Sequence, residues 1–163
     1  MQNDKDKNKG RKGERNFLEK VIFKMQRNGE DIDYRKPTYT NEPDDGLDFE
    51  LKVPHNTGER LEAIANHKDT IQPPSNKKID IRVDHKNYDN KIGKPVAQKF
   101  IDDIHKNPID TEHWLTGGNG LTKPAQEVLN QAQKPVRYFS QRDINTISNY
   151  YDNELENTLD NEK

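Results

Sequence analysis

The stretch IDIRVDHKNY, residues 79–88, decides the fold of this chain. Its apolar residues Ile79, Ile81 and Val83 alternate with charged residues, which is the period-two pattern of a strand with one buried face. The opposite face ends in Asp84 and Lys86, because alternate side chains of a strand point the same way. The stretch therefore predicts a strand that carries a carboxylate and an ammonium group side by side.

A second strand is predicted upstream, where the acidic turn at residues 43–45 is followed by GLDFEL at residues 46–51. Taken alone, Asp84 and Lys86 are typical of an exposed charge pair on a strand, which contributes little to stability. Asp48 on the neighbouring strand changes this interpretation. Two carboxylates and a lysine on adjacent strands can hold a divalent cation and poise a water beside a phosphate. The pattern therefore favours a metal-binding catalytic site that acts on a phosphate-containing substrate.

The composition bounds the protein class. The chain has 163 residues, which suggests a single domain, and its hydrophobic content of 28% predicts a modest core. The absence of cysteine excludes disulfides and thiolate zinc sites. A net charge of −2 gives no overall basic field, so contact with nucleic acid requires a local patch. No apolar run reaches the ~18 residues of a membrane span, and we expect a cytoplasmic protein that contacts no membrane.

The charge is divided between the two ends. Residues 1–13 carry five Lys or Arg and two Asp, whereas residues 152–163 carry five Asp or Glu and one Lys. Polar, charged ends without apolar anchors are typically disordered. We therefore expect a disordered basic tail at residues 1–12, a folded domain at residues 13–151 and a disordered acidic tail at residues 152–163.

Periodicity and capping signals predict an alternation of helices and strands in the folded domain. Strands are expected at 31–39, 47–53, 79–88, 111–116 and 135–139, and helices at 13–27, 95–105, 123–133 and from 141 to about 151. An insertion at residues 54–78 separates the second and third strands and holds a short helix within residues 58–71. A strand meander followed by strand–helix units indicates an α/β sandwich with a central mixed sheet flanked by helices.

Four segments resemble one known group of enzymes. GLDF at 46–49 resembles a glycine–apolar–Asp strand, and VDHKNY at 83–88 resembles the second motif of the PD-(D/E)xK nuclease superfamily. The later segment LTGGNGLTKPA at 115–125 and the helix LEKVI at 18–22 are similar to its Mrr-like restriction endonuclease branch. The resemblance implies a restriction-endonuclease-like sandwich and a metal-dependent endodeoxyribonuclease of the restriction or DNA-processing kind.

The resemblance also implies roles for particular residues. Asp48, Asp84 and the backbone carbonyl of His85 are expected to bind Mg²⁺ or Mn²⁺, since hard cations favour oxygen ligands. Lys86 is expected to orient the attacking water and to offset charge on the phosphate. Glu19 is a weaker candidate for a further carboxylate at the site.

DNA is the expected partner. Lys91 and Lys94 lie around Gly93 in the loop after the third strand, where they are expected to contact backbone phosphates or to lie in solvent. Target recognition is expected to come from the 54–78 insertion, from a homodimer partner, or from a partner protein. That insertion is longer than the hairpin that usually joins the two catalytic strands of the family.

Three alternatives stay open. One is a catalytically inactive nucleic-acid-binding module of the same fold, and another is a Holliday-junction-resolvase-like nuclease, which GER at residues 13–15 faintly suggests. The third is an interaction protein whose charges only solvate its surface. Arg60 and His67, with six residues between them, are also spaced like the Arg and His of metal-independent ribonucleases, but the predicted fold is not all-α.

Overall fold

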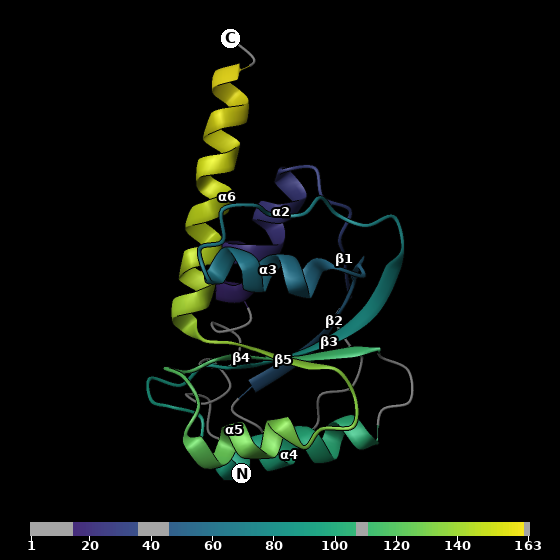
Figure 1. The fold of residues 1–163 in the computed structure, drawn as a ribbon, viewed down its shortest axis with the longest axis vertical. Coiled ribbons are helices and arrows are strands. Elements are labelled where there is room, and N and C mark those ends of the chain that lie inside the picture. The colour runs from purple at the N-terminus through teal and green to yellow at the C-terminus, as the bar shows by residue number, and fades with distance from the viewer. Residues whose placement is uncertain (1–14, 36–45, 107–110, 162–163) are drawn as a thin grey trace.

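The computed structural model describes residues 15–35, 46–106 and 111–161, and for residues 46–48 and 158–161 it describes the backbone alone. Its centre is a five-stranded sheet in which the strands lie side by side in chain order (Figure 1). The first three strands are antiparallel and the last three are parallel, so the predicted mixed sheet is confirmed. The strands are β1 (Asp33–Arg35), β2 (Gly46–Pro54), β3 (Lys78–Lys86), β4 (Glu112–Gly117) and β5 (Val136–Phe139).

Helices cover both faces of the sheet, which makes the α/β sandwich expected from the sequence (Figure 1). One face carries η1 (Leu18–Ile22), α2 (Phe23–Arg27), α3 (Thr57–Ala65) and α6 (Gln141–Asn161). The other face carries α4 (Lys94–His105) and α5 (Lys123–Asn130), the crossover helices of the parallel strands. Within the described ranges no helix is long and apolar enough to cross a membrane.

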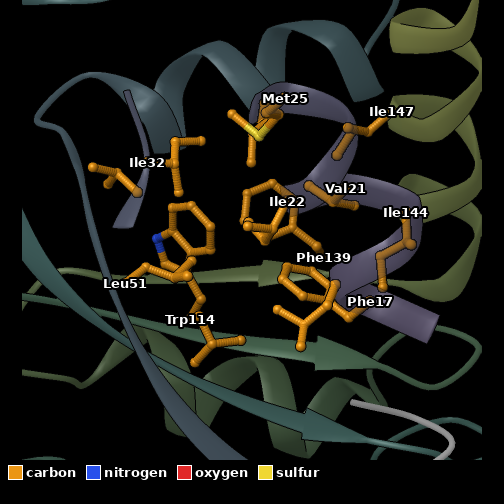
Figure 2. Close-up of a cluster of buried hydrophobic side chains, with 14 of the residues drawn as sticks. Phe17, Val21, Ile22, Met25, Ile32, Leu51, Trp114, Phe139, Ile144 and Ile147 are labelled. Atoms are coloured by element: carbon orange, nitrogen blue, oxygen red, sulfur yellow. The ribbon is translucent and has the colours of Figure 1, made fainter. Parts of the chain in front are cut away.

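Each face of the sheet has its own apolar core. On the η1 face, Ile81 and Val83 of β3 and Trp114 of β4 are fully buried, as the period-two pattern of β3 predicted. Figure 2 shows Trp114 from the sheet and Phe139 from β5 packed against the side chains of η1, α2 and α6. On the α4 face, Leu115 packs with apolar side chains of α4 and α5. The two apolar cores hold one layer of helices on each face of the sheet.

The N-terminal helix differs from a regular α-helix. Its apolar stripe is buried as predicted, with Phe17, Val21 and Met25 at or below 1% exposure. Residues 18–22 nevertheless form a π-helical segment, which the spacing of apolar residues does not distinguish from an α-helix. Gly29 ends the helix with a φ of 88°, a conformation that glycine adopts without steric cost.

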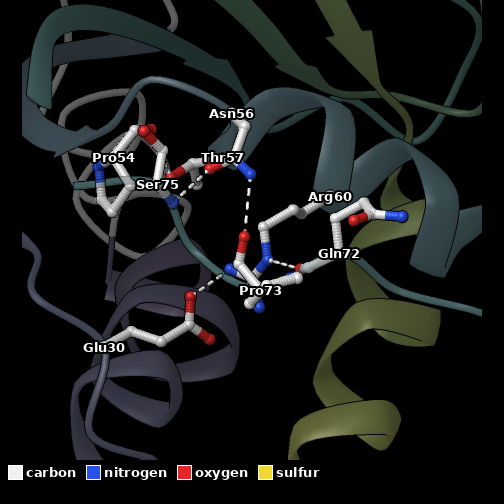
Figure 3. A network of polar contacts seen from close by, with 8 residues as sticks. All are labelled: Glu30, Pro54, Asn56, Thr57, Arg60, Gln72, Pro73 and Ser75. Atoms are coloured by element: carbon white, nitrogen blue, oxygen red, sulfur yellow. Dashed lines mark hydrogen bonds and ion pairs between the residues drawn. The ribbon is translucent and has the colours of Figure 1, made fainter. Parts of the chain in front are cut away.

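The insertion at residues 54–78 is an ordered part of the fold (Figure 3). Its helix α3 ends at Ala65, earlier than the predicted span to residue 71. Asn56 donates to the Pro73 carbonyl (2.9 Å) and accepts from the Ser75 amide (2.9 Å), which closes the segment on itself. Arg60 donates to the Gln72 carbonyl (2.7 Å) and pairs with Glu30. The Arg60–Glu30 ion pair therefore ties the insertion to the segment that follows α2.

The C-terminal helix corrects one prediction. Ser140 and Asp143 form a capping box at the start of α6, each side chain accepting from the other residue's amide at 3.1 and 3.0 Å. The predicted disordered tail at residues 152–163 is wrong for residues 152–161, because α6 continues to Asn161. Extending a formed helix costs little compared with starting one, and Asp152 pairs with Lys24 of α2 at 2.7 Å. Residues 1–14 lie outside the described residues.

Candidate active site

The C-terminal end of β3 carries a buried pair of opposite charges. Asp84 is 4% and Lys86 3% exposed, and Lys86 Nζ lies 3.2 Å from Asp84 Oδ1. Their two-residue spacing places both side chains on one face of the strand, as predicted. Removing two charges from water costs several kcal/mol per ion, so such a pair is weak evidence for stability. The buried pair at the end of β3 is therefore the candidate for a functional site.

Asp48 lies in β2, the neighbouring strand. The register of the antiparallel pair sets Asp48 opposite Asp84 and Gly46 opposite Lys86. The side chain of Asp48 lies outside the described residues, and the strand register gives the position of its backbone. The two aspartate positions predicted from the sequence are therefore direct cross-strand partners at the backbone level.

His85 points to the opposite face of β3. Its Nδ1 lies 2.7 Å from Thr116 Oγ1 of β4, and its ring packs against Phe17 with a centroid distance of 5.9 Å. Burial, helped by the positive charge of Lys86, lowers the pKa of His85 to about 4. The imidazole is therefore neutral at pH 7 and anchors β3 to β4 and to the N-terminal helix. Its side chain is structural, and the proposed ligand role concerns its carbonyl alone.

A glycine turn after β4 supports the same strand end. Tyr138 of β5 donates to the Gly117 carbonyl (2.6 Å) and accepts from the Gly120 amide (3.2 Å). The Asn119 amide donates to the Asn90 carbonyl (2.9 Å), which ties the turn to the loop that follows Lys86. The amides of residues 119 and 120 are therefore engaged in hydrogen bonds within the protein, and the glycine segment is a tight structural turn.

A cavity of about 140 Å³ opens beside the charged pair. Asp84 and Lys86 form one wall, and helix α4 with the preceding loop forms the other. The remaining lining residues are Tyr88, Pro95, Val96, Lys99 and Phe100. Among the described side chains, the lining combines one carboxylate and two ammonium groups with apolar walls.

The other predicted residues lie outside this lining. Lys91 and Lys94 are exposed, in the loop and at the first turn of α4. Glu19 is exposed on η1, because its neighbours Leu18, Val21 and Ile22 turn into the core. Among the described residues that line the cavity, Glu19 is absent, so its proposed role is not supported by the geometry.

The alternative Arg60–His67 pair is also not assembled. Arg60 is 7% exposed and is engaged by Glu30 and by the Gln72 carbonyl. His67 has a positive φ of 56° and lines a separate groove between the α3 end and α6. Arg60 is therefore a structural residue of the insertion.

The oxygen atoms at the end of β3 have the chemistry of ligands for a divalent cation. Among the described side chains, which do not include that of Asp48, no three His, Asp or Glu come together as a metal site. The buried Asp84 carboxylate faces the cavity, and the cross-strand position holds a second aspartate. Carboxylate and carbonyl oxygens with room for water suit Mg²⁺ or Mn²⁺. The residues present fit such an ion.

Lys99 is the charged residue that sequence reasoning missed. Nothing in the strand motif points to it, since it lies on α4, thirteen residues after Lys86. A signal was nevertheless present. Lys99 follows Val96 by three residues, and residues three apart share a helix face. Once α4 is packed on β3 through that face, Lys99 is directed to the charged pair.

Comparison with known proteins gives one result. No protein-family model matches the chain, and no curated protein is detectably similar in sequence. Among solved structures, the DNA modification-dependent restriction endonuclease AspBHI is similar with a TM-score of 0.49 and 16% identity. The match covers 99% of this chain and 40% of that chain, so this chain spans two fifths of that protein's length. At this score and identity the likeness carries no conclusion about activity.

Proposed function

We propose that this chain is a metal-dependent endodeoxyribonuclease that hydrolyses DNA phosphodiester bonds. The observation that carries the proposal is the buried Asp84–Lys86 pair, which lines a cavity and lies across from Asp48. Directly opposite residues of an antiparallel pair share a face of the sheet. Two carboxylates and a lysine on one face match the arrangement that the sequence resemblance implies.

The residues have distinct tasks in this proposal. Asp48, Asp84 and the His85 carbonyl hold Mg²⁺ or Mn²⁺, which supplies Lewis-acid polarisation of the phosphate when bound. Lys86 offsets the charge that develops on the phosphate, and its low exposure strengthens this effect because the surroundings are poor in water. Lys91 and Lys94 contact the DNA backbone outside the cavity and read no sequence.

The test is cleavage of supercoiled plasmid DNA by the purified chain with Mg²⁺ or Mn²⁺. Asp48→Asn, Asp84→Asn and Lys86→Ala are expected to lower the rate by about 100- to 1,000-fold, the cost of removing one electrostatic contact from a transition state. Asp80→Asn is the matched control, because Asp80 lies on the same strand but does not line the cavity.

Four outcomes count against the proposal. Cleavage without a divalent cation contradicts the role of the metal. Equal activity of wild type, Asp84→Asn and Lys86→Ala contradicts the site. DNA binding without cleavage by the wild type favours the inactive binding module instead, and cleavage confined to four-way junctions favours the resolvase-like alternative.

A further inference from the structure

The cavity beside Asp84 is too small for a nucleobase with its sugar. Its volume is about 140 Å³, whereas pockets for drug-sized ligands measure ~300–1,000 Å³. With ~30 Å³ for each water in the liquid, the space corresponds to about four or five waters. A compact group such as a phosphate with a few waters fits this space.

The described lining offers an anion two ammonium groups. Lys86 and Lys99 lie beside the carboxylate of Asp84, and with Asp48 and a divalent cation in place, as in the proposed function, the site would carry a surplus positive charge. The two lysines come from different elements, β3 and α4, and the apolar side chains of Val96 and Phe100 lie around them. Low-dielectric walls strengthen the attraction for a charged ligand.

We infer that Lys99 binds the DNA phosphate that occupies this cavity and fixes the position of the strand against Asp84 and Lys86. This inference rests on the proposed function and names a phosphate-positioning residue within it. A lysine ammonium is a compact charge that holds a phosphate without reading sequence. Both lysines therefore contact the same phosphate, with Lys86 offsetting the charge that develops on it and Lys99 holding it in position.

The matched control comes from the same helix. Lys106 is exposed at the C-terminal end of α4 and does not line the cavity. Lys99→Gln and Lys106→Gln remove the same charge from one helix, so a general electrostatic effect changes both. Lys99→Arg keeps the charge at the site. Thermal unfolding of each variant checks that α4 still packs.

The first measurement is independent of cleavage. Dimethyl phosphate, a minimal phosphodiester, is titrated into the wild type and the variants in the presence of Mg²⁺ while backbone amides are followed by NMR. We expect saturable shifts at residues 84–88 and 96–100, an affinity about tenfold weaker for Lys99→Gln, unchanged affinity for Lys106→Gln, and an affinity for Lys99→Arg between those of the wild type and Lys99→Gln. Equal affinity of Lys99→Gln and Lys106→Gln overturns the inference.

The second measurement is plasmid cleavage. Lys99→Gln is expected to raise KM about tenfold with kcat within threefold, because a phosphate contact made before and during the reaction changes binding alone. A lowered kcat with unchanged KM overturns the positioning role. If the wild type cleaves and Lys99→Gln matches Lys106→Gln, the inference fails while the proposed function stands. If the wild type does not cleave but dimethyl phosphate binding depends on Lys99, the proposed function fails while the phosphate site stands.

Discussion

Gly117 lies against the backbone of Lys86 so closely that a Cβ at position 117 would stand 1.9 Å from the Lys86 carbonyl oxygen. The two residues are register partners at the ends of the parallel strands β4 and β3. Gly117 also has a φ of 98°, which other residues rarely adopt. Because position 117 has no side chain, the backbone of Lys86 can lie against β4 in the position that pairs Lys86 with Asp84.

Gly117→Ala is expected to destabilise the protein by more than about 4 kcal/mol, because backbone overlap adds to the strain of the positive φ. Gly120→Ala is the matched control. Gly120 has a φ of 106° but nothing within 4 Å of a built Cβ, so it should cost only about 1–2 kcal/mol. Urea unfolding of both variants measures the difference, and equal losses would show that the contact with Lys86 is unimportant.

The Asp84–Lys86 pair is expected to behave as a coupled unit in stability. Lys86→Met leaves a buried carboxylate without its ammonium partner and should cost about 3 kcal/mol. The double variant Asp84→Asn with Lys86→Met removes both charges and should be more stable than the sum of the single losses predicts. Chemical denaturation of the three variants and the wild type gives the coupling free energy, and strictly additive losses would contradict a close pair.

His85 is expected to make stability fall in mild acid. Its pKa is lowered to about 4 in the folded protein, chiefly by burial, against an unfolded value of 6.5. The unfolded chain therefore binds the extra proton first as the pH drops. Stability from the neutral imidazole is full above pH 6.5 and is lost between pH 6.5 and 4, by about 3 kcal/mol in total.

The measurement is the free energy of unfolding from pH 8 to 4 for the wild type and for His85→Asn. Other titrating groups contribute equally to both proteins, so the difference between the two curves isolates His85. The stability of the wild type minus that of His85→Asn should be constant above pH 6.5 and should fall as the pH drops from 6.5 to 4. Parallel curves over this range would show that His85 does not titrate as a buried group.

The contacts of Lys24 with Ser148 and Asp152 are expected to stabilise the C-terminal part of α6. Lys24 Nζ lies 2.7 Å from Asp152 Oδ1 and donates to Ser148 Oγ at 2.7 Å. Asp152→Asn should lower global stability by less than about 1 kcal/mol, because its side chain is half-exposed. Hydrogen exchange should nevertheless become faster after residue 152, and unchanged protection there would mean that helix extension alone maintains this segment.

Local patterns in the sequence were sufficient for most of the fold. The alternation of Ile79, Ile81 and Val83 determined β3 and its buried face, since a strand's side chains alternate regardless of what packs on them. Ser140 and Asp143 determined the start of α6 through bonds that span three residues. Asp84 and Lys86 were found for the same reason, because two-residue spacing on a strand guarantees a shared face.

Contacts between distant segments were decided only by the tertiary structure. Lys99 joined the site because α4 packs over the end of β3, and Asp152 stayed helical beside a lysine 128 residues away in the chain. The sequence by itself determined which residues share a strand face or a helix cap, because these relations follow from fixed backbone geometry. The packing of β3, β4 and α4 decided which of these faces meet, what is buried between them, and how large a space is left beside Asp84.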